Sequence, residues 1–200
     1  MLDNLPVFGC VLIGGKSSRL GQPKHLLQHP TGQTWIEHTV ELLQQVSEQV
    51  IIVGAAELPK SLANHVRLPD APDAVGPLAG LLAAMRFSPQ ASWLVAACDL
   101  PNLSVQALRW LLSTRAADVW ATLPRLPGQP GVEPLLAYYD FRSRMLLEQL
   151  AQQGKFSINQ LASHSKIISP SPPAELAKAW QNVNTPEELR AYLCKTNQPV

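Results

Sequence analysis

Short apolar runs alternate along the chain with longer amphipathic segments, and this alternation predicts strands that are separated by helices. The apolar runs are four to seven residues long, a length typical of strands that are buried on both faces. They predict strands over residues 7–13, 50–53, 93–97, 119–123 and 135–139, with a short extended stretch at 66–68.

Two of the predicted helices begin with recognisable capping sequences. Thr34 is followed three residues later by Glu37, the arrangement of a capping box, and predicts a helix over 34–47. Thr185, Pro186 and Glu188 give the same signal at the start of the last helix. Further helices are predicted over 81–87, 104–113, a segment that ends at 152, and 158–162.

The order of these elements predicts an α/β fold. Strands that alternate with helices form a mostly parallel sheet with helices on both faces, which gives three layers. A chain of 200 residues fits one such domain and can bury roughly 70% of the surface of its unfolded form. We therefore expect a single domain over residues 1–200.

The composition limits the classes of partner. The formal net charge is +1, charged residues make up 16% of the chain, and no basic cluster extends beyond Arg19 and Lys24. These values predict a small anionic ligand and no nucleic-acid partner. No apolar run approaches the roughly 20 residues of a membrane span and no export signal is recognisable, so we expect no membrane association and a cytoplasmic location.

The cysteines and histidines do not form a metal-binding or disulfide pattern. Cys10, Cys98 and Cys194 are too scattered for a disulfide framework, and the first two are expected to be buried, reduced thiols. The five histidines lack the spacing of a metal site. His25 is interpreted as a structural or rim residue, with a catalytic role as the alternative.

A glycine-rich, cationic segment at residues 12–24 follows the first predicted strand. Gly14, Gly15 and Gly21 let the main chain approach a ligand closely, so that its N–H groups can hold anionic oxygens. Arg19 and Lys24 add two positive charges to the same loop. The spacing fits neither the G-x-G-x-x-G dinucleotide motif nor the Walker loop, so the segment predicts a phosphate-binding loop of another kind.

Asp99 stands where the apolar run 93–97 gives way to Cys98, Asp99, Leu100 and Pro101. Ligands of open parallel sheets bind at the carboxyl ends of the strands, and Mg²⁺ bound with nucleotide phosphates needs only one or two protein carboxylates. Asp99 therefore predicts a Mg²⁺ ligand. The alternative is an aspartate that caps a turn before a proline.

Three other segments carry weaker signals. Asp70 and the small-residue turn 76–80 could approach a base or ribose, or could only begin a helix. Asn182 and Asn184 would point to the same side of an extended segment, although asparagine is also common before a helix. The Pro- and Gly-rich segment 124–131 is expected to be exposed, mobile and at the border of the site. Glu133, which follows it, is interpreted as a contact of the second substrate or as an ordinary exposed residue at the start of a strand.

In this order the motifs resemble the molybdenum cofactor guanylyltransferases, within the wider family of nucleotidyltransferases. The resemblance extends over nearly the whole chain, and its C-terminal motif, Asn-Val-Asn-Thr-Pro-Glu-Glu-Leu, is more particular to the molybdenum cofactor branch than the others are. The five motifs lie at residues 12–24, 76–80, 98–101, 133–137 and 182–189.

The resemblance implies a Rossmann-like nucleotidyltransferase fold and transfer of GMP from GTP to the terminal phosphate of molybdopterin. It implies Mg²⁺ as cofactor, release of pyrophosphate, and transient contact with proteins that make or accept the cofactor. Under it Arg19 and Lys24 would stabilise phosphate charge, and Asp99 would hold the metal. Nucleotide contacts would come from Leu12, Ile13, Gly14, Gly15, Lys24, Asp70, Gly80 and Asp99, and second-substrate contacts from Asn182 and Asn184.

Three positions depart from the family pattern. Val53 and Gly54 stand where relatives often have an asparagine, His25 is an unusual neighbour for Lys24, and Glu133 replaces a common histidine. Because base selectivity depends on single hydrogen bonds, alternatives stay open. They are a cytidylyltransferase acting on the same pterin, a related sugar-phosphate nucleotidyltransferase, and a non-catalytic cofactor carrier.

Overall fold

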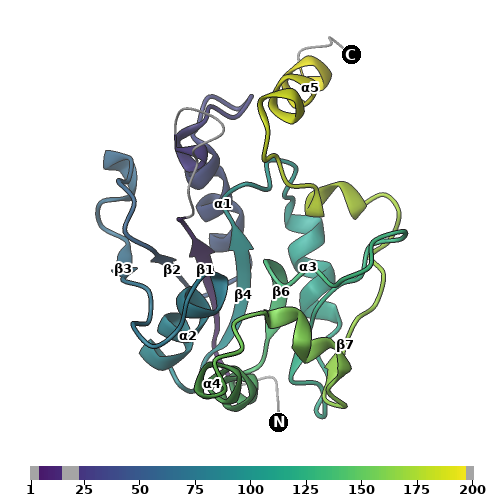
Figure 1. Cartoon of the computed structure of the whole chain (residues 1–200). Helices are drawn as coiled ribbons and strands as arrows, with labels where there is room; N and C mark the ends of the chain where they lie inside the picture. Colours follow the sequence, from purple (N-terminus) through teal and green to yellow (C-terminus); the bar gives the residue numbers. More distant parts are fainter. Residues whose placement is uncertain (1–4, 15–22, 197–200) are drawn as a thin grey trace.

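The computed structural model describes residues 5–14 and 23–196. Its centre is a seven-stranded sheet of order β3-β2-β1-β4-β6-β5-β7 (Figure 1). β3, β2, β1 and β4 are parallel, β6 runs antiparallel to both β4 and β5, and β5 is parallel to β7. The strands are β1 Val7–Leu12, β2 Gln49–Val53, β3 Val66–Leu68, β4 Ser92–Ala97, β5 Ala121–Thr122, β6 Leu136–Tyr139 and β7 Ile167–Ile168.

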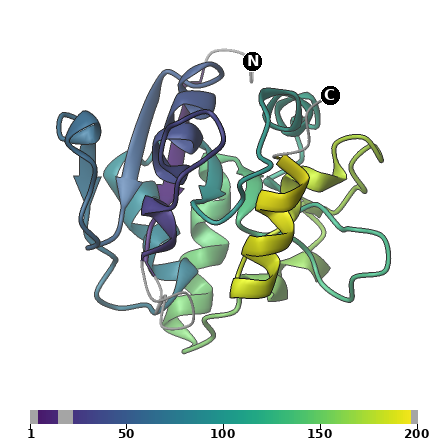
Figure 2. The same cartoon turned by 90° about the horizontal axis from the view of Figure 1, so that it is seen from above.

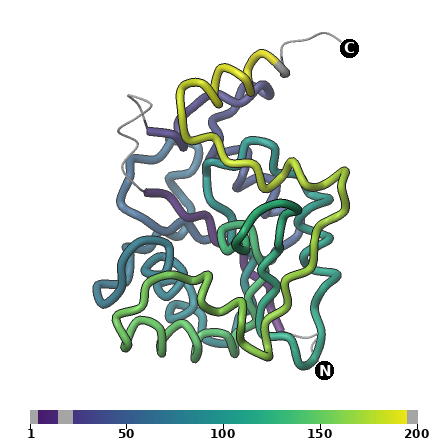
Figure 3. Tube along the Cα trace, turned by 45° about the vertical axis from the view of Figure 1, so that its right-hand side comes forward, coloured from purple at the N-terminus to yellow at the C-terminus, as the bar shows by residue number. Residues whose placement is uncertain are grey.

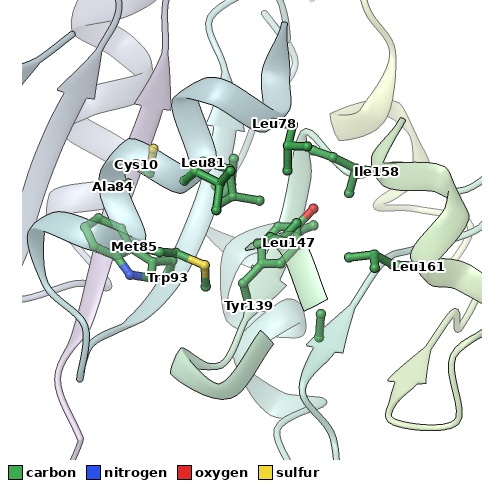
Figure 4. Close-up of a cluster of buried hydrophobic side chains, with 14 of the residues drawn as sticks. Cys10, Leu78, Leu81, Ala84, Met85, Trp93, Tyr139, Leu147, Ile158 and Leu161 are labelled. Atoms are coloured by element: carbon green, nitrogen blue, oxygen red, sulfur yellow. The ribbon is translucent and has the colours of Figure 1, made fainter. Parts of the chain in front are cut away.

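Helices cover both faces of the sheet, as predicted for a three-layer α/β fold. Alternate residues of one strand point to opposite faces, so Cys10 of β1 packs in one hydrophobic cluster and Val11 in the other. α2 and α4 cover the first face (Figure 4), and α1 and α3 the second. The helices are α1 Trp35–Gln44, α2 Pro77–Phe87, α3 Val105–Ser113, α4 Arg144–Gln152 and α5 Pro186–Thr196.

The last helix, α5, lies beyond the carboxyl ends of β1 and β4 (Figures 1 and 2). It runs beside the segment that follows residue 23 (Figure 3), because Tyr192 of α5 and Val183 share a small hydrophobic cluster with Leu27 and Trp35. This cluster brings the C-terminal part of the chain to the edge of the sheet where parallel strands bind ligands.

Three of the predicted helix starts are confirmed, those of α1, α3 and α5. Thr34 and Glu37 form the reciprocal capping box of α1: the Thr34 N–H donates to the Glu37 carboxylate at 2.7 Å. Ser104 caps α3, accepting a hydrogen bond from the Ala107 N–H at 3.3 Å. At α5 the N–H of Glu188 donates to the Thr185 hydroxyl and the N–H of Thr185 donates to the Glu188 carboxylate. These residues satisfy N–H groups that a helix start leaves unpaired.

Several predicted boundaries were wrong. α2 begins at Pro77, four residues before the expected start at 81, because proline is well suited to the first turn of a helix. The expected strand 119–123 is regular only over Ala121–Thr122, and the expected helix at 158–162 is a 3₁₀ segment, Ile158–Ser163. None of the helices in the described ranges has both the length and the apolar character needed to cross a membrane.

Candidate active site

A cavity of about 560 Å³ opens at the carboxyl ends of β1, β2 and β4. This volume lies within the range of small-molecule and cofactor sites. Segments after four of the parallel strands and the start of α2 form its walls. The cavity is lined by Leu12, Ile13, Gly14, Pro23, Lys24, His25, Val53, Ala56, Asp70, Gly76, Pro77, Gly80, Ala97, Cys98, Asp99 and Leu135.

On the β4 side of the cavity, three distant segments meet at Lys24. This residue begins the short 3₁₀ helix η1 (Lys24–Leu26), and its ammonium group donates to Asp99 Oδ2 at 3.1 Å and to Asn184 Oδ1 at 2.5 Å. The N–H of Val183 donates to the main-chain oxygen of Asp99 at 3.1 Å, which places the C-terminal segment directly beside the end of β4. Lys24 and Asp99 are each 18% exposed, so their attraction is screened less than that of a surface pair.

The second carboxylate oxygen of Asp99 is available to a cation. Asp99 Oδ1 is buried and has no hydrogen-bond partner within the described part of the chain. Most buried polar atoms in proteins do have a partner, because burying one without a partner costs free energy. Among the described residues no group of three or more acidic, histidine or cysteine side chains could hold a metal by itself. A metal at Asp99 would therefore complete its coordination with ligand oxygens and water, as Mg²⁺ commonly does.

The β2 and β3 side of the cavity has a different character. Gly80 of α2 lies so close to its neighbours that an added Cβ would be 2.7 Å from the Leu12 side chain and 3.3 Å from Asp70 Oδ1. Partial burial raises the pKa of the Asp70 carboxyl. A side chain at position 80 would push into the space between Leu12 and Asp70, so the glycine keeps this part of the cavity open.

The structure brings most of the sequence-predicted site residues together. The predicted residues Leu12, Ile13, Gly14, Lys24, Asp70, Gly80 and Asp99 all line the cavity. Asn184 contacts Lys24, whereas Asn182 is exposed and is not part of the cavity lining in the described ranges. Gly15, Arg19 and Gly21 lie outside the described residues.

The segment 124–131 is largely exposed, as expected, but lines no part of this cavity in the structure as described. Glu133 does not line it either; it is half-buried, and burial raises the pKa of its carboxyl. Leu135 is the nearest lining residue from this region, and the expectation that 124–131 borders the site was wrong for the described cavity.

Sequence reasoning missed the apolar lining residues Ala56 and Cys98. Ala56 and Cys98 each lie within three residues of a strand's carboxyl end, and this position was the only available signal. Cys98 is buried, which raises the pKa of its thiol to about 12, and Cys10 is buried with its pKa raised as well. Both are therefore protonated at neutral pH, in agreement with their interpretation as inert buried thiols.

A cavity at the carboxyl ends of an α/β sheet, with a lysine held against a carboxylate, is suited to nucleotide phosphates, and the family match defines the class of this protein as a nucleotidyltransferase. Residues 9–167 match the model of the MobA-like NTP transferase domain. The chain belongs to this family, and its predicted membership is confirmed.

Curated relatives and solved structures agree with this membership. A probable molybdenum cofactor guanylyltransferase of Bacillus cereus is 32% identical over 90% of this chain and 92% of its own length. A protein of the same name from Bacillus cytotoxicus is 30% identical over 94% of this chain and 98% of its own length. The crystal structure of molybdopterin-guanine dinucleotide biosynthesis protein A from Archaeoglobus fulgidus has a TM-score of 0.77 and 26% identity, covering 94% of this chain and 98% of that one.

Proposed function

We propose that the protein transfers GMP from GTP to the terminal phosphate of molybdopterin, forms molybdopterin guanine dinucleotide and releases pyrophosphate. The main support for this proposal is the contact between Lys24 and Asp99, which are 75 positions apart in the sequence and line a cavity large enough for a nucleotide. It puts a phosphate-neutralising cation and a metal-binding carboxylate at one point. The names of the relatives support guanine as the base and molybdopterin as the acceptor.

The reaction is an in-line displacement at the α-phosphorus of GTP. A terminal phosphate oxygen of molybdopterin forms a new bond to this phosphorus, while the bond to the bridging oxygen of the β-phosphate breaks and its electron pair leaves with pyrophosphate. The protein's task is positioning and charge stabilisation, because no covalent enzyme intermediate is needed. Lys24, with Arg19 from the segment outside the described residues, would stabilise charge on the triphosphate and on departing pyrophosphate.

Asp99 fits a magnesium ion. Its Oδ2 is fixed by Lys24, and its buried Oδ1 has no partner in the described part of the chain, so one carboxylate can join the lysine to a cation. When bound, Mg²⁺ would supply Lewis-acid stabilisation of the phosphate oxygens.

The two ends of the cavity suggest how the substrates are arranged. Leu12, Ile13, Gly14, Asp70 and Gly80 would hold the nucleoside: the side chains of Leu12 and Asp70 both lie beside Gly80, and the Ile13 N–H donates to the Val53 main-chain oxygen of β2. Asn184, which contacts Lys24, and the exposed Asn182 would face the pterin substrate. We place the reaction in the cytoplasm, with the product passed to acceptor proteins through transient contacts.

The test is a pyrophosphate-release assay with molybdopterin, Mg²⁺ and each of GTP, CTP, ATP and UTP. We expect release with GTP at a rate well above that with the other three, and none when molybdopterin is omitted. Preference for CTP would replace the guanylyl assignment with a cytidylyl one. Cofactor binding without pyrophosphate release from any nucleotide would indicate a carrier.

A further inference from the structure

The loop that follows β2 forms one wall of the cavity and is held by side chains from two other segments. We call residues 54–57 the wall loop; Ala56 within it, and Val53 just before it, line the cavity. His25 Nε2 lies 2.7 Å from the Glu57 main-chain oxygen. Arg67 of β3 donates to the main-chain oxygen of Gly54 at 3.0 Å and to that of Ala56 at 2.5 Å.

The wall loop also lies against Ile13, the residue that follows β1. Gly54 has φ 129°, and an added Cβ would lie 1.8 Å from the Ile13 main-chain oxygen. The loop is therefore fixed at its start by main-chain contact, at its outer edge by Arg67, and at its end by His25.

His25 and Lys24 are neighbours in sequence but reach opposite sides of the cavity. In a 3₁₀ helix consecutive side chains are about 120° apart, so Lys24 can contact Asp99 after β4 while His25 contacts Glu57 after β2. His25 is 4% exposed, and its Nε2 faces a carbonyl that can only accept a hydrogen bond. Nε2 therefore carries a proton and donates it, which makes this nitrogen unsuitable as a general base.

We propose that His25 is a positioning residue: by holding the wall loop it sets the affinity for the nucleotide and the selectivity for its base. Side-chain donors occupy the carbonyls of three of the four wall-loop residues, while the Ala56 N–H forms no hydrogen bond within the described part of the chain. A free donor beside the nucleoside end suits guanine, whose O6 accepts, and disfavours adenine, whose N6 donates. This inference rests on the proposed function for the identity of the preferred base.

The experiment compares His25→Met with His25→Gln by isothermal titration with GTP and ATP and by steady-state kinetics. Methionine fills the space without a donor, whereas glutamine supplies an amide N–H at similar reach. We expect His25→Met to raise the Kd for GTP about threefold to tenfold, to lower the preference for GTP over ATP by a similar factor, and to change KM more than kcat. His25→Gln is expected to stay within about twofold of the wild type.

Two further variants make the test specific. His65→Met removes a hydrogen-bonded histidine at the amino end of β3, away from the cavity, and is expected to bind GTP as the wild type does. Arg67→Met loosens the same wall loop from its exposed side, so its effect and that of His25→Met should be less than additive in the double variant. It also tests the wall loop if His25→Met does not fold.

The outcomes separate the two proposals. Unchanged GTP affinity and base preference in both His25→Met and Arg67→Met would overturn the role of His25, as would an equal loss in His25→Gln and His25→Met. If the wild type itself binds another nucleotide better than GTP, the proposed base is wrong. The role of His25 is then decided by the Kd of that preferred nucleotide in the same variants.

Discussion

Lys24 and Asp99 show how a single contact can define a site at the level of residues. Lys24 begins the short 3₁₀ helix η1, and Asp99 follows β4. Their contact places a cation and a carboxylate at the same point of the cavity. Asp99 makes use of both oxygens: one accepts from Lys24, and the other is buried without a partner among the described residues.

Asp99→Asn should therefore abolish most activity and leave the fold intact. The amide keeps the shape of the carboxylate but loses the charge that a metal ion requires, so we expect kcat/KM for GTP to fall about 100-fold or more. Pyrophosphate release measures this loss, and a melting temperature close to that of the wild type shows that the fold persists. Asp118→Asn, at an exposed position away from the cavity, is the control. Full turnover of Asp99→Asn would remove Asp99 from the mechanism.

Gly54 is a second residue whose identity is fixed by its surroundings. Gly54→Ala should destabilise the protein by about 2–4 kcal/mol, because the new methyl group meets the Ile13 main-chain oxygen in addition to the strain of a positive φ. Gly128→Ala is the matched control: it also has a positive φ, 76°, but nothing lies within 4 Å of the added atom. We expect it to cost only about 1–2 kcal/mol. Urea denaturation measures both, and equal losses would contradict the steric argument.

At the level of elements, α2 and α4 are joined on one face of the sheet by the charged side chain of Arg86. Arg86 donates to both oxygens of Asp73, at 2.6 and 2.7 Å, and to both oxygens of Glu148 in α4, at 2.9 and 2.6 Å. The hydrogen bonds from Arg86 lower the pKa of Asp73 to about 2. Asp73 lies three residues before Gly76, which lines the cavity together with Pro77.

Arg86→Met should lower the melting temperature at pH 7 by about 2–4 °C. The Asp73 carboxyl has a lower pKa in the folded than in the unfolded protein, so its contribution is present above its usual pKa near 3.8 and is lost as the pH falls to about 2. The difference between wild type and variant should therefore shrink across this range. Melting curves of both proteins at pH 7, 4, 3 and 2 test this prediction. A difference in melting temperature that stays constant would show that the contact of Arg86 with Asp73 does not contribute to stability.

At the level of the whole molecule, the C-terminal segment is tied to the body of the sheet. The buried indole of Trp180 donates to the main-chain oxygen of Leu136 in β6 at 2.8 Å and makes an edge contact with Trp110 of α3. Val183, a few residues later, donates to Asp99. The family model ends at residue 167, yet later residues complete the hydrophobic core that contains Trp180 and contact the active site at Asp99.

The protein is therefore expected to unfold as one cooperative domain. Tryptophan fluorescence, which reports on Trp180 and Trp93 in the two opposite cores, and far-ultraviolet circular dichroism should give coincident urea transitions. GTP and Mg²⁺ should raise the urea midpoint slightly, and by the same amount for both probes. Two separated transitions would contradict the prediction of a single domain over residues 1–200.

Local patterns in the sequence were sufficient to predict most of the helices and strands. The largely buried apolar run of β1 and the capping residues Thr34 and Thr185 are local features, so they could be recognised without the fold. The antiparallel direction of β6 could not, because an apolar run such as 136–139 is the same in either direction. The short β7 and the early start of α2 were also missed, since they depend on what packs beside them.

The sequence by itself determined the class of fold and the chemistry available to the site: glycines after the first strand, Lys24, and a carboxylate at the end of an apolar run. It could do so because strand ends and loop glycines are local features. Only the tertiary structure decided which of these groups meet. Lys24 reaches Asp99 and Asn184, and His25 reaches Glu57, through contacts between segments 32 to 160 positions apart, whose distances follow from packing and not from spacing along the chain.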